Sequence, residues 1–292
     1  MTQMQCLHPS EKSWLPGQNC KNAMKGHTLF NWIFAILASL VLLFIIAPLA
    51  GMFLDSSFSE MRSTATDPAV RRSVWFTLAI AFASTFLFAT GAVPLAWIMA
   101  RRNFPLKNVV QGIIDLPVVL PHTAAGIALL GFLSRDGLLG GAAQKAGIIL
   151  VSNGAGIAMA MAFVSLPFLI NAARDGFAAV PERTEKAALM LGASPSRIFF
   201  TVSLPQAWRS VVSGFIMMFA RGMSEFGAVV IIAYHPMIAP VLIYDRFNSY
   251  GLTAARPASI LFILVALIFF VLFRILATER RQFFRREDDA TD

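Results

Sequence analysis

Arginine and glutamate stand four residues apart inside an apolar stretch, at Arg221 and Glu225. Side chains at this spacing share one face of a helix and can form an ion pair. Inside a membrane such groups are costly unless paired or wetted, so this face is expected to point into a helix bundle. Two roles remain open. Either Arg221 supplies positive potential to an anion pathway, or the two side chains neutralise each other as a structural pair, which is the favoured interpretation of their contact.

A second group with possible chemistry lies in the stretch DLPVVLPH, which begins with Asp115 and ends with His122. The prolines within it each remove a backbone donor, so a helix is expected to kink or break there. His122 could hydrogen-bond a substrate, or it could cap backbone groups that the prolines free. The candidate translocation pathway therefore comprises Asp115, Pro117, Pro121, His122, Arg221 and Glu225. The spacing matches no metal site and no nucleophile–base pair, which argues against a membrane enzyme.

The composition places these residues in a membrane protein. Of the 292 residues 57% are hydrophobic and only 14% are charged, which gives enough apolar length for several bilayer spans. A net charge of +8 would suggest nucleic acid as the partner of a soluble protein. Here the basic residues flank apolar runs, so membrane topology explains them better and no nucleic-acid partner is expected.

The apolar runs predict an all-α fold of six transmembrane helices, residues 29–276, between cytoplasmic tails at 1–28 and 277–292. The first run is too long for a signal peptide and is expected to be retained. Cys6 and Cys20 lie in the first tail and are interpreted as reduced thiols. The predicted spans are Leu29–Leu54, Ser73–Ala100, Val109–Leu133, Ala146–Ala173, Ser210–Tyr234 and Pro257–Leu276.

Three of these spans are expected to be irregular. Besides the prolines of the third span, the second carries Gly91 and Pro94, and the fourth carries Gly154, Gly156 and Pro167. Non-helical backbone at membrane depth is tolerated only where protein or a water-filled cavity surrounds it. A shorter apolar piece, Met237–Tyr244, is too short to cross and is expected to be re-entrant or interfacial.

The distribution of basic residues predicts the orientation. With the N-terminus inside, the segments on the inner side hold 16 Lys and Arg, and those on the outer side hold 7. Because inner loops of membrane proteins are enriched in these residues, both termini and the loop near residue 190 are predicted to be cytoplasmic. The expected location is the cell (inner) membrane.

That cytoplasmic loop, residues 181–205, predicts two short helices. Pro181 suits a first helical position, and Glu185 falls in the first turn, where it complements the helix dipole. Gly192 stands where a helix end favours a left-handed residue, and Ser194 precedes a proline as an N-cap does. Helices this short are marginal in water alone, so they need a partner surface.

The same loop resembles the EAA signature of ABC importer permeases. The residues that carry the resemblance are Glu185, Ala187, Ala188, Gly192, Ser194, Ile198, Leu204 and Pro205, with a looser tail than the family pattern. The resemblance implies that this loop is a coupling helix, which docks into a groove of a cytoplasmic ATPase subunit. An ordinary connector in another polytopic protein is the alternative.

Two further stretches resemble the molybdate/tungstate permease branch, Ala220–Leu252 and Asp115–Leu133. Their A-R-x-x-x-E-[FY]-G core is shared with sulfate permeases. The resemblance implies a type I importer with a second copy of this chain, two ATPase subunits that hold ATP and magnesium, and an extracytoplasmic oxyanion-binding protein. On this interpretation the outer loops at 134–147 and 235–256 meet the binding protein.

The chain itself has no G-x-x-x-x-G-K-[ST], so no bound cofactor is expected and another subunit would bind ATP. Three alternatives stay open: a sulfate permease, a secondary transporter without an ATPase, and a membrane enzyme. The absence of an evident internal repeat counts mildly against the inverted-repeat transporters.

Overall fold

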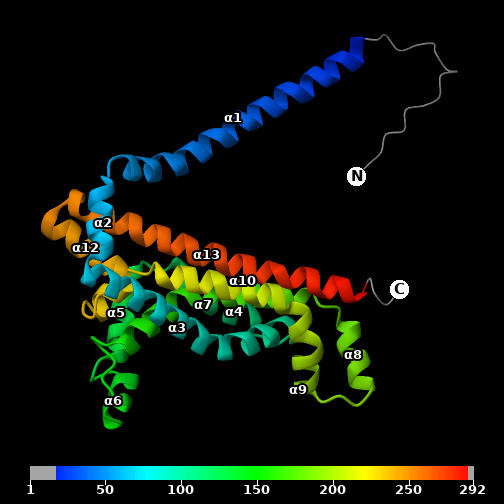
Figure 1. The fold of residues 1–292 in the computed structure, drawn as a ribbon. Helices are drawn as coiled ribbons and strands as arrows, with labels where there is room; N and C mark the ends of the chain where they lie inside the picture. The colour runs from blue at the N-terminus through cyan, green and yellow to red at the C-terminus, as the bar shows by residue number, and fades with distance from the viewer. Residues whose placement is uncertain (1–17, 289–292) are drawn as a thin grey trace. The chain divides into compact units, whose positions relative to one another are not determined.

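The computed structural model describes the backbone of residues 18–288 and the side chains of residues 30–275. Within this range every regular element is helical (Figure 1). The elements are α1 (Gln18–Leu54), α2 (Phe58–Thr66), α3 (Pro68–Arg101), α4 (Lys107–Val119), α5 (His122–Leu133), α6 (Leu138–Lys145), α7 (Gly154–Ala179), α8 (Glu182–Met190), α9 (Pro195–Ile198), the π-helix η1 (Phe199–Ser203), α10 (Leu204–Met223), α11 (Gly227–Ile232), α12 (Ala239–Tyr250) and α13 (Leu252–Asp288).

The chain divides into two units, residues 1–55 and 56–292. The first unit contains α1, which begins within the predicted tail and continues through the first apolar run. Its segment Phe30–Leu54 is long and apolar enough to cross a bilayer. The thiol groups of Cys6 and Cys20, like every side chain of both predicted tails, lie outside the described side chains.

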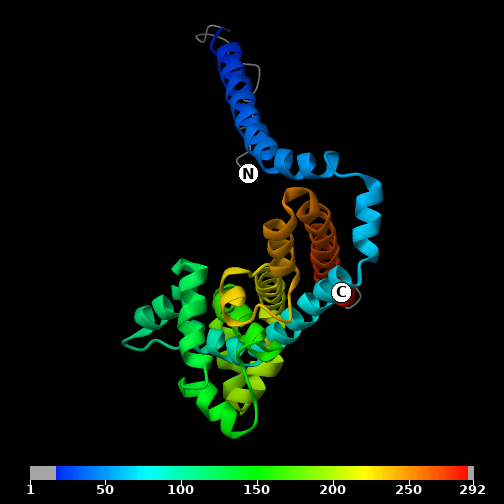
Figure 2. The same ribbon diagram turned by 90° about the vertical axis from the view of Figure 1, so that its left-hand side faces the viewer.

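The second unit is built around α7, whose thirteen buried residues make it the most enclosed helix in the described part of the chain. Helices α3 and α10 pack along it (Figure 1). The α10 contact depends on small residues, because a side chain at Gly214 would lie within 2.9 Å of Ala172 Cβ. Close backbone approach through small residues is the usual way in which membrane helices gain packing contacts. Figure 2 turns the α2 and α12 end of this unit toward the viewer.

The expectation of six spans is not confirmed by helix length and composition. Four helices in the described residues are long and apolar enough to cross a bilayer: Phe30–Leu54, Pro68–Arg101, Gly154–Ala179 and Leu252–Ile275. The pair α4 and α5 is a fifth if it is counted as one span, and it is bent by 112°. The predicted fifth span, Ser210–Tyr234, is instead divided between α10 and α11 by a break at residues 224–226.

The prolines have unequal effects on the helices. The break predicted in the third span is confirmed: α4 ends at Val119, and α5 begins after Pro121. The expected irregularity of the second and fourth spans is not a break, because Pro94 and Pro167 lie inside the continuous helices α3 and α7. A proline removes one backbone hydrogen bond, and packed neighbours can hold the rest of a helix together.

Two other predicted boundaries need correction. The fourth span starts at Gly154 rather than Ala146, because the preceding residues include left-handed backbone at Gly147 and Ser152. Only residues 239–244 of the apolar piece Met237–Tyr244 lie in α12, which has 12 residues and is too short to cross a bilayer.

Candidate functional site: the loop 181–205 and the polar cluster of the bundle

The loop 181–205 forms two short helices, as its sequence predicts. Pro181 lies one position earlier than expected, at the N-cap of α8. Gly192 has a φ of 82°, the left-handed conformation expected after a helix end. Ser194 caps α9 by accepting a hydrogen bond from the Arg197 backbone N–H at 3.4 Å, and Pro195 follows it at a first-turn position. A π-helical segment, η1, then leads into α10.

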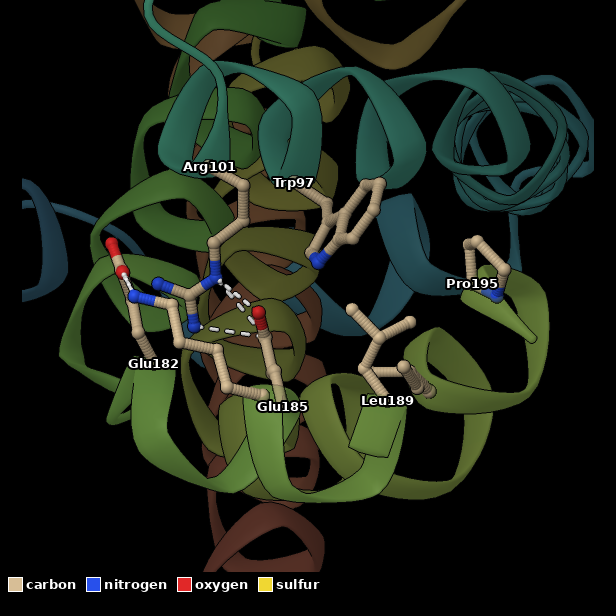
Figure 3. Close-up of a pocket in the computed structure, with 8 residues that line it drawn as sticks. Trp97, Arg101, Glu182, Glu185, Leu189 and Pro195 are labelled. Carbon is tan, nitrogen blue, oxygen red and sulfur yellow. Dashed lines mark hydrogen bonds and ion pairs between the residues drawn. The ribbon is translucent and has the colours of Figure 1, made fainter. Parts of the chain in front are cut away.

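Glu185 turns its carboxylate toward the end of α3 (Figure 3). Arg101 Nε lies 2.9 Å from Glu185 Oε2, and Arg101 Nη2 donates to Oε1 at 2.9 Å. The hydroxyl of Ser203, in η1, donates to the same Oε1 at 2.6 Å. Arg101 also donates to the backbone oxygen of Val180, just before α8, at 2.9 Å. One carboxylate thereby connects α3, α8 and η1.

The loop exposes apolar side chains next to its turn. Met190 and Leu191 are each 88% exposed, although they stand next to the loop's turn at Gly192. No residue of α8 is buried. Beneath the helix is a hollow of about 260 Å³, whose walls include Trp97, Leu189, Pro195 and Ile198 (Figure 3). Exposed apolar residues on a polar loop are typical of a surface that a partner covers.

The charges at the start of α8 fall into two classes. Glu182 pairs with Lys186 at 2.8 Å on the open surface, and its hydrogen bond from Lys186 lowers the pKa of that carboxyl. Glu185, in contrast, is only 14% exposed and points inward to Arg101. The first turn of α8 therefore has one solvated acid and one acid committed to an internal contact.

The polar cluster in the bundle brings together three of the predicted pathway residues. Arg221 Nη1 lies 2.9 Å from Glu225 Oε2, which confirms the contact expected from their spacing. The ring of His122 lies beside them, with Nε2 3.0 Å from Arg221 Nη2 and Nδ1 3.5 Å from Glu225 Oε2. Exposure decreases from His122 at 48% through Arg221 at 24% to Glu225 at 1%.

Glu225 also caps the start of α11. Its Oε1 accepts the Ala228 backbone N–H at 2.9 Å, so the carboxylate satisfies a donor at the start of α11. The α5 and α11 backbones come close at this point, since a side chain at Gly227 would lie 2.6 Å from His122 Cβ. The break that divides the predicted fifth span therefore places a buried acid next to a histidine from the third.

Asp115 belongs to a different cluster. Its carboxylate accepts hydrogen bonds from Gln111 at 2.8 Å and from Asn171 at 2.6 Å, so it joins α4 to α7. Pro117 is buried inside α4, and Pro121 is exposed at the N-cap of α5. The contacts in the described residues thus join His122, Arg221 and Glu225 directly, while Asp115 has its own amide partners.

The comparisons with known proteins supply the family. Residues 92–282 match the family described as binding-protein-dependent transport system inner membrane component. This chain belongs to that family. It is therefore a transport permease subunit, and the matched range includes both the loop 181–205 and the polar cluster.

Several relatives of this permease are closely similar in sequence. The molybdate/tungstate transport system permease protein WtpB of Thermococcus kodakarensis is 40% identical over 86% of this chain and 97% of its own length. The WtpB of Pyrococcus furiosus is 41% identical over 86% of this chain and 96% of its own length. The sulfate transport system permease CysT of Synechococcus elongatus is 33% identical over 82% and 87%.

Solved structures support the fold of this permease. A bacterial ABC transporter that imports the polysaccharide alginate has a chain with a TM-score of 0.71 and 15% identity, covering 89% of this chain and 99% of its own. A chain of the MetNI methionine ABC transporter has a TM-score of 0.56 and 17% identity, covering 72% and 93%. At this identity the likeness concerns the fold.

Sequence reasoning about this permease missed the partners of its acids. Arg101 directly follows the predicted second span, and no motif of the sequence singles out Ser203, Gln111 or Asn171. Arg101 and Glu185 are 84 positions apart, so no local spacing reveals their contact. The available signal was a basic residue directly after the predicted second span and a first-turn acid in the loop 181–205.

Proposed function

We propose that this permease conducts molybdate or tungstate across the cell (inner) membrane as part of an ATP-driven importer. The observation that carries the proposal is the similarity to the WtpB proteins, 40% identical over almost their whole length. The sulfate permeases compared are 29–33% identical over a similar share of the chain. Both groups carry tetrahedral oxyanions, so the charge and shape of the cargo are common to the two alternatives.

The cluster of Arg221, His122 and Glu225 suits a transit path rather than a tight site. Its arginine can contribute positive potential, but a buried glutamate lies 2.9 Å from it and offsets that charge. A path of this balance attracts a dianion weakly and releases it again. Tight recognition would then belong to the binding protein that delivers the oxyanion.

The proposed topology has six crossings and cytoplasmic termini. It counts α1, α3, the pair α4–α5, α7, the pair α10–α11 and α13 as the crossings. The excess of Lys and Arg in the inner segments supports this orientation, and the broken pairs lie next to the polar cluster. Reporter fusions at residue 190 and at the C-terminus should report cytoplasm, and fusions at 60 and 245 the opposite side.

The partners follow from the proposed role. We infer a second copy of this chain, two cytoplasmic ATPase subunits that hold ATP and magnesium, and an oxyanion-binding protein near 134–147 and 235–256. The coupling surface would include the exposed Met190 and Leu191, next to the signature residues of the loop. Burial of these side chains in a groove of the ATPase would supply the partner surface that a helix of nine residues needs.

The test is transport into proteoliposomes that contain the whole complex, with molybdate, tungstate, sulfate and phosphate in competition. Inhibition of labelled molybdate uptake by tungstate, but not by equal sulfate or phosphate, supports the proposal. Inhibition by sulfate or phosphate alone, with the two metal oxyanions inert, would assign the chain to a sister branch.

Two alternatives, a sulfate permease and a secondary transporter, can be tested by transport assays. A sulfate permease is supported by the A-R-x-x-x-E-[FY]-G core shared with that branch, and the competition assay decides between the two cargoes. A secondary transporter needs no ATPase, so uptake driven by an ion gradient without ATP, and purification without an ATPase chain, would support it.

A further inference from the structure

The contact between α3 and the loop 181–205 holds helix α8 in place. Helix α8 has no buried residue, and its apolar side chains Leu189 and Met190 are exposed. Its attachment to α3 therefore depends on polar contacts, among which Glu185 provides the bonds to Arg101 and Ser203. A nine-residue helix without buried side chains is marginal on its own.

The geometry of Arg101 suits an anchor. Its guanidinium contacts both carboxylate oxygens of Glu185 and also the Val180 carbonyl. It therefore binds the first turn of α8 and the residue just before that helix at the same time. Such a planar, multidentate contact fixes direction as well as distance. At 10% and 14% exposure, the two side chains are shielded from solvent competition.

We propose that Arg101 is a positioning residue for coupling, and that Glu185 is its internal anchor rather than a contact to the ATPase. Through this pair, with Ser203 as the third member, a displacement of α8 is passed to α3 and to α10. The exposed residues Met190 and Leu191 are left to make the ATPase contact. The inference rests on the proposed function, in that it assumes an ATPase partner at α8.

The Glu185 carboxylate is connected to two long helices, α3 through Arg101 and α10 through Ser203. Arg101 is the last residue of α3, which packs on α7 in the core of the second unit. Ser203 is the last residue of η1, directly before α10. α10 carries Arg221 near its far end. The carboxylate of Glu185 is thus the point at which one loop helix meets both the scaffold and the helix of the polar cluster.

The experiment compares Arg101→Gln, Glu185→Gln and the double variant in the full complex. Matched controls are Arg102→Gln, the exposed neighbour of Arg101, and Glu182→Gln, an exposed acid in the same first turn. Three quantities are measured: ATPase recovered with the permease, molybdate imported per ATP hydrolysed, and hydrogen exchange of residues 182–190 in the full-length permease in lipid nanodiscs.

If the pair positions α8, each single variant recovers ATPase as the parent does but imports about tenfold less molybdate per ATP, within the usual range of coupling between sites. The double variant should be no worse than either single one, because both remove the same interaction. Exchange of residues 182–190 should accelerate in all three variants and stay at the parental rate in both controls.

Three results would overturn the inference. Loss of ATPase recovery in Glu185→Gln, but not in Arg101→Gln, would show that Glu185 contacts the ATPase directly. Additive losses in the double variant would show that the two residues act separately. Parental exchange and parental import per ATP in both single variants would show that the pair positions nothing.

One further variant keeps the outcome decisive. If Arg101→Gln does not insert, Arg101→Lys keeps the charge without the forked geometry and should give an intermediate loss. Failure of the proposed function is recognised separately. In that case the parent complex imports no molybdate at all, while ATPase recovery and hydrogen exchange still report on the pair.

Discussion

Two acids of this permease, Glu185 and Glu225, form the same kind of ion pair in different settings. Glu185 and Glu225 each hold an arginine at 2.9 Å. Glu185 finds its arginine 84 positions away on another helix, whereas Glu225 finds its own one helical turn earlier. The contact between Glu185 and Arg101 joins helix α8 to helix α3. The contact between Arg221 and Glu225 lies at the break between α10 and α11, and the two side chains offset each other's charge.

The third member of each group sharpens the contrast. Glu185 receives a hydroxyl hydrogen bond from Ser203, which adds a second element to the anchor. Glu225 caps α11 by accepting a hydrogen bond from the Ala228 backbone N–H, and it lies 3.5 Å from His122 of the third predicted span. If the proposed coupling role is right, replacing Glu185 should mainly lower transport per ATP, whereas replacing Glu225 should mainly lower the stability of the permease.

The largest expected effect is on Glu225, since it is the more deeply buried acid. We expect Glu225→Gln to destabilise the permease by about 3 kcal/mol, the lower end for breaking a buried ion pair. Glu185→Gln, in the more exposed pair, should cost less. Thermal unfolding of both variants in the same detergent measures the difference. An equal or larger loss in Glu185→Gln would contradict the contrast between the two acids.

The loop's turn can be broken without touching either acid. Gly192 has open space around it, so Gly192→Val is strained only by its φ of 82°, by about 1–2 kcal/mol. We expect the protein to insert normally, to bind the ATPase weakly and to lose uptake. Gly192→Asn is the control, because asparagine tolerates this conformation, and it should keep most activity. Normal uptake by Gly192→Val would show that the turn does not shape the coupling surface.

The polar cluster can be tested by removing its arginine. We expect Arg221→Gln to slow molybdate or tungstate uptake about tenfold, because a hydrogen bond to a charged group contributes about 1.5 kcal/mol or more. The relative preference for the two oxyanions should stay the same. Competition between them in proteoliposomes measures it. A changed preference would show that the permease itself selects its cargo.

The smallest effect concerns a pair outside the bundle. The Ala69 backbone N–H and Arg246 keep the pKa of the Asp67 carboxyl below its ordinary value, and Asp67 caps α3. The charged form is therefore the stabilising one above the ordinary value of about 3.9. This contribution declines as the pH falls through the lowered value. We expect Asp67→Ala to cost about 1 kcal/mol at pH 7.

The same measurement series checks the pH dependence. Stability of the parent should fall between pH 5 and pH 3 by more than that of Asp67→Ala, since the variant has lost the titrating group. An identical decline in both proteins would exclude a contribution of Asp67.

Much of the architecture could be predicted because it depends on short-range properties. Apolar length places the helices in the membrane, and the α4–α5 break follows from Pro117 and Pro121. The turn at Gly192 and the cap at Ser194 depend on neighbouring backbone alone. The prediction was wrong where packing overrode a local signal, as at Pro94 and Pro167, which lie inside continuous helices.

The sequence by itself determined the membrane class, the helical loop and the contact of Arg221 with Glu225, because a spacing of four residues places side chains on one helix face. Only the tertiary structure decided which acids meet which distant partners. Arg101 reaches Glu185, Asn171 reaches Asp115 and His122 reaches Arg221 over 84, 56 and 99 positions. Such contacts depend on how whole helices pack and rotate against one another, and no local pattern of residues encodes that arrangement.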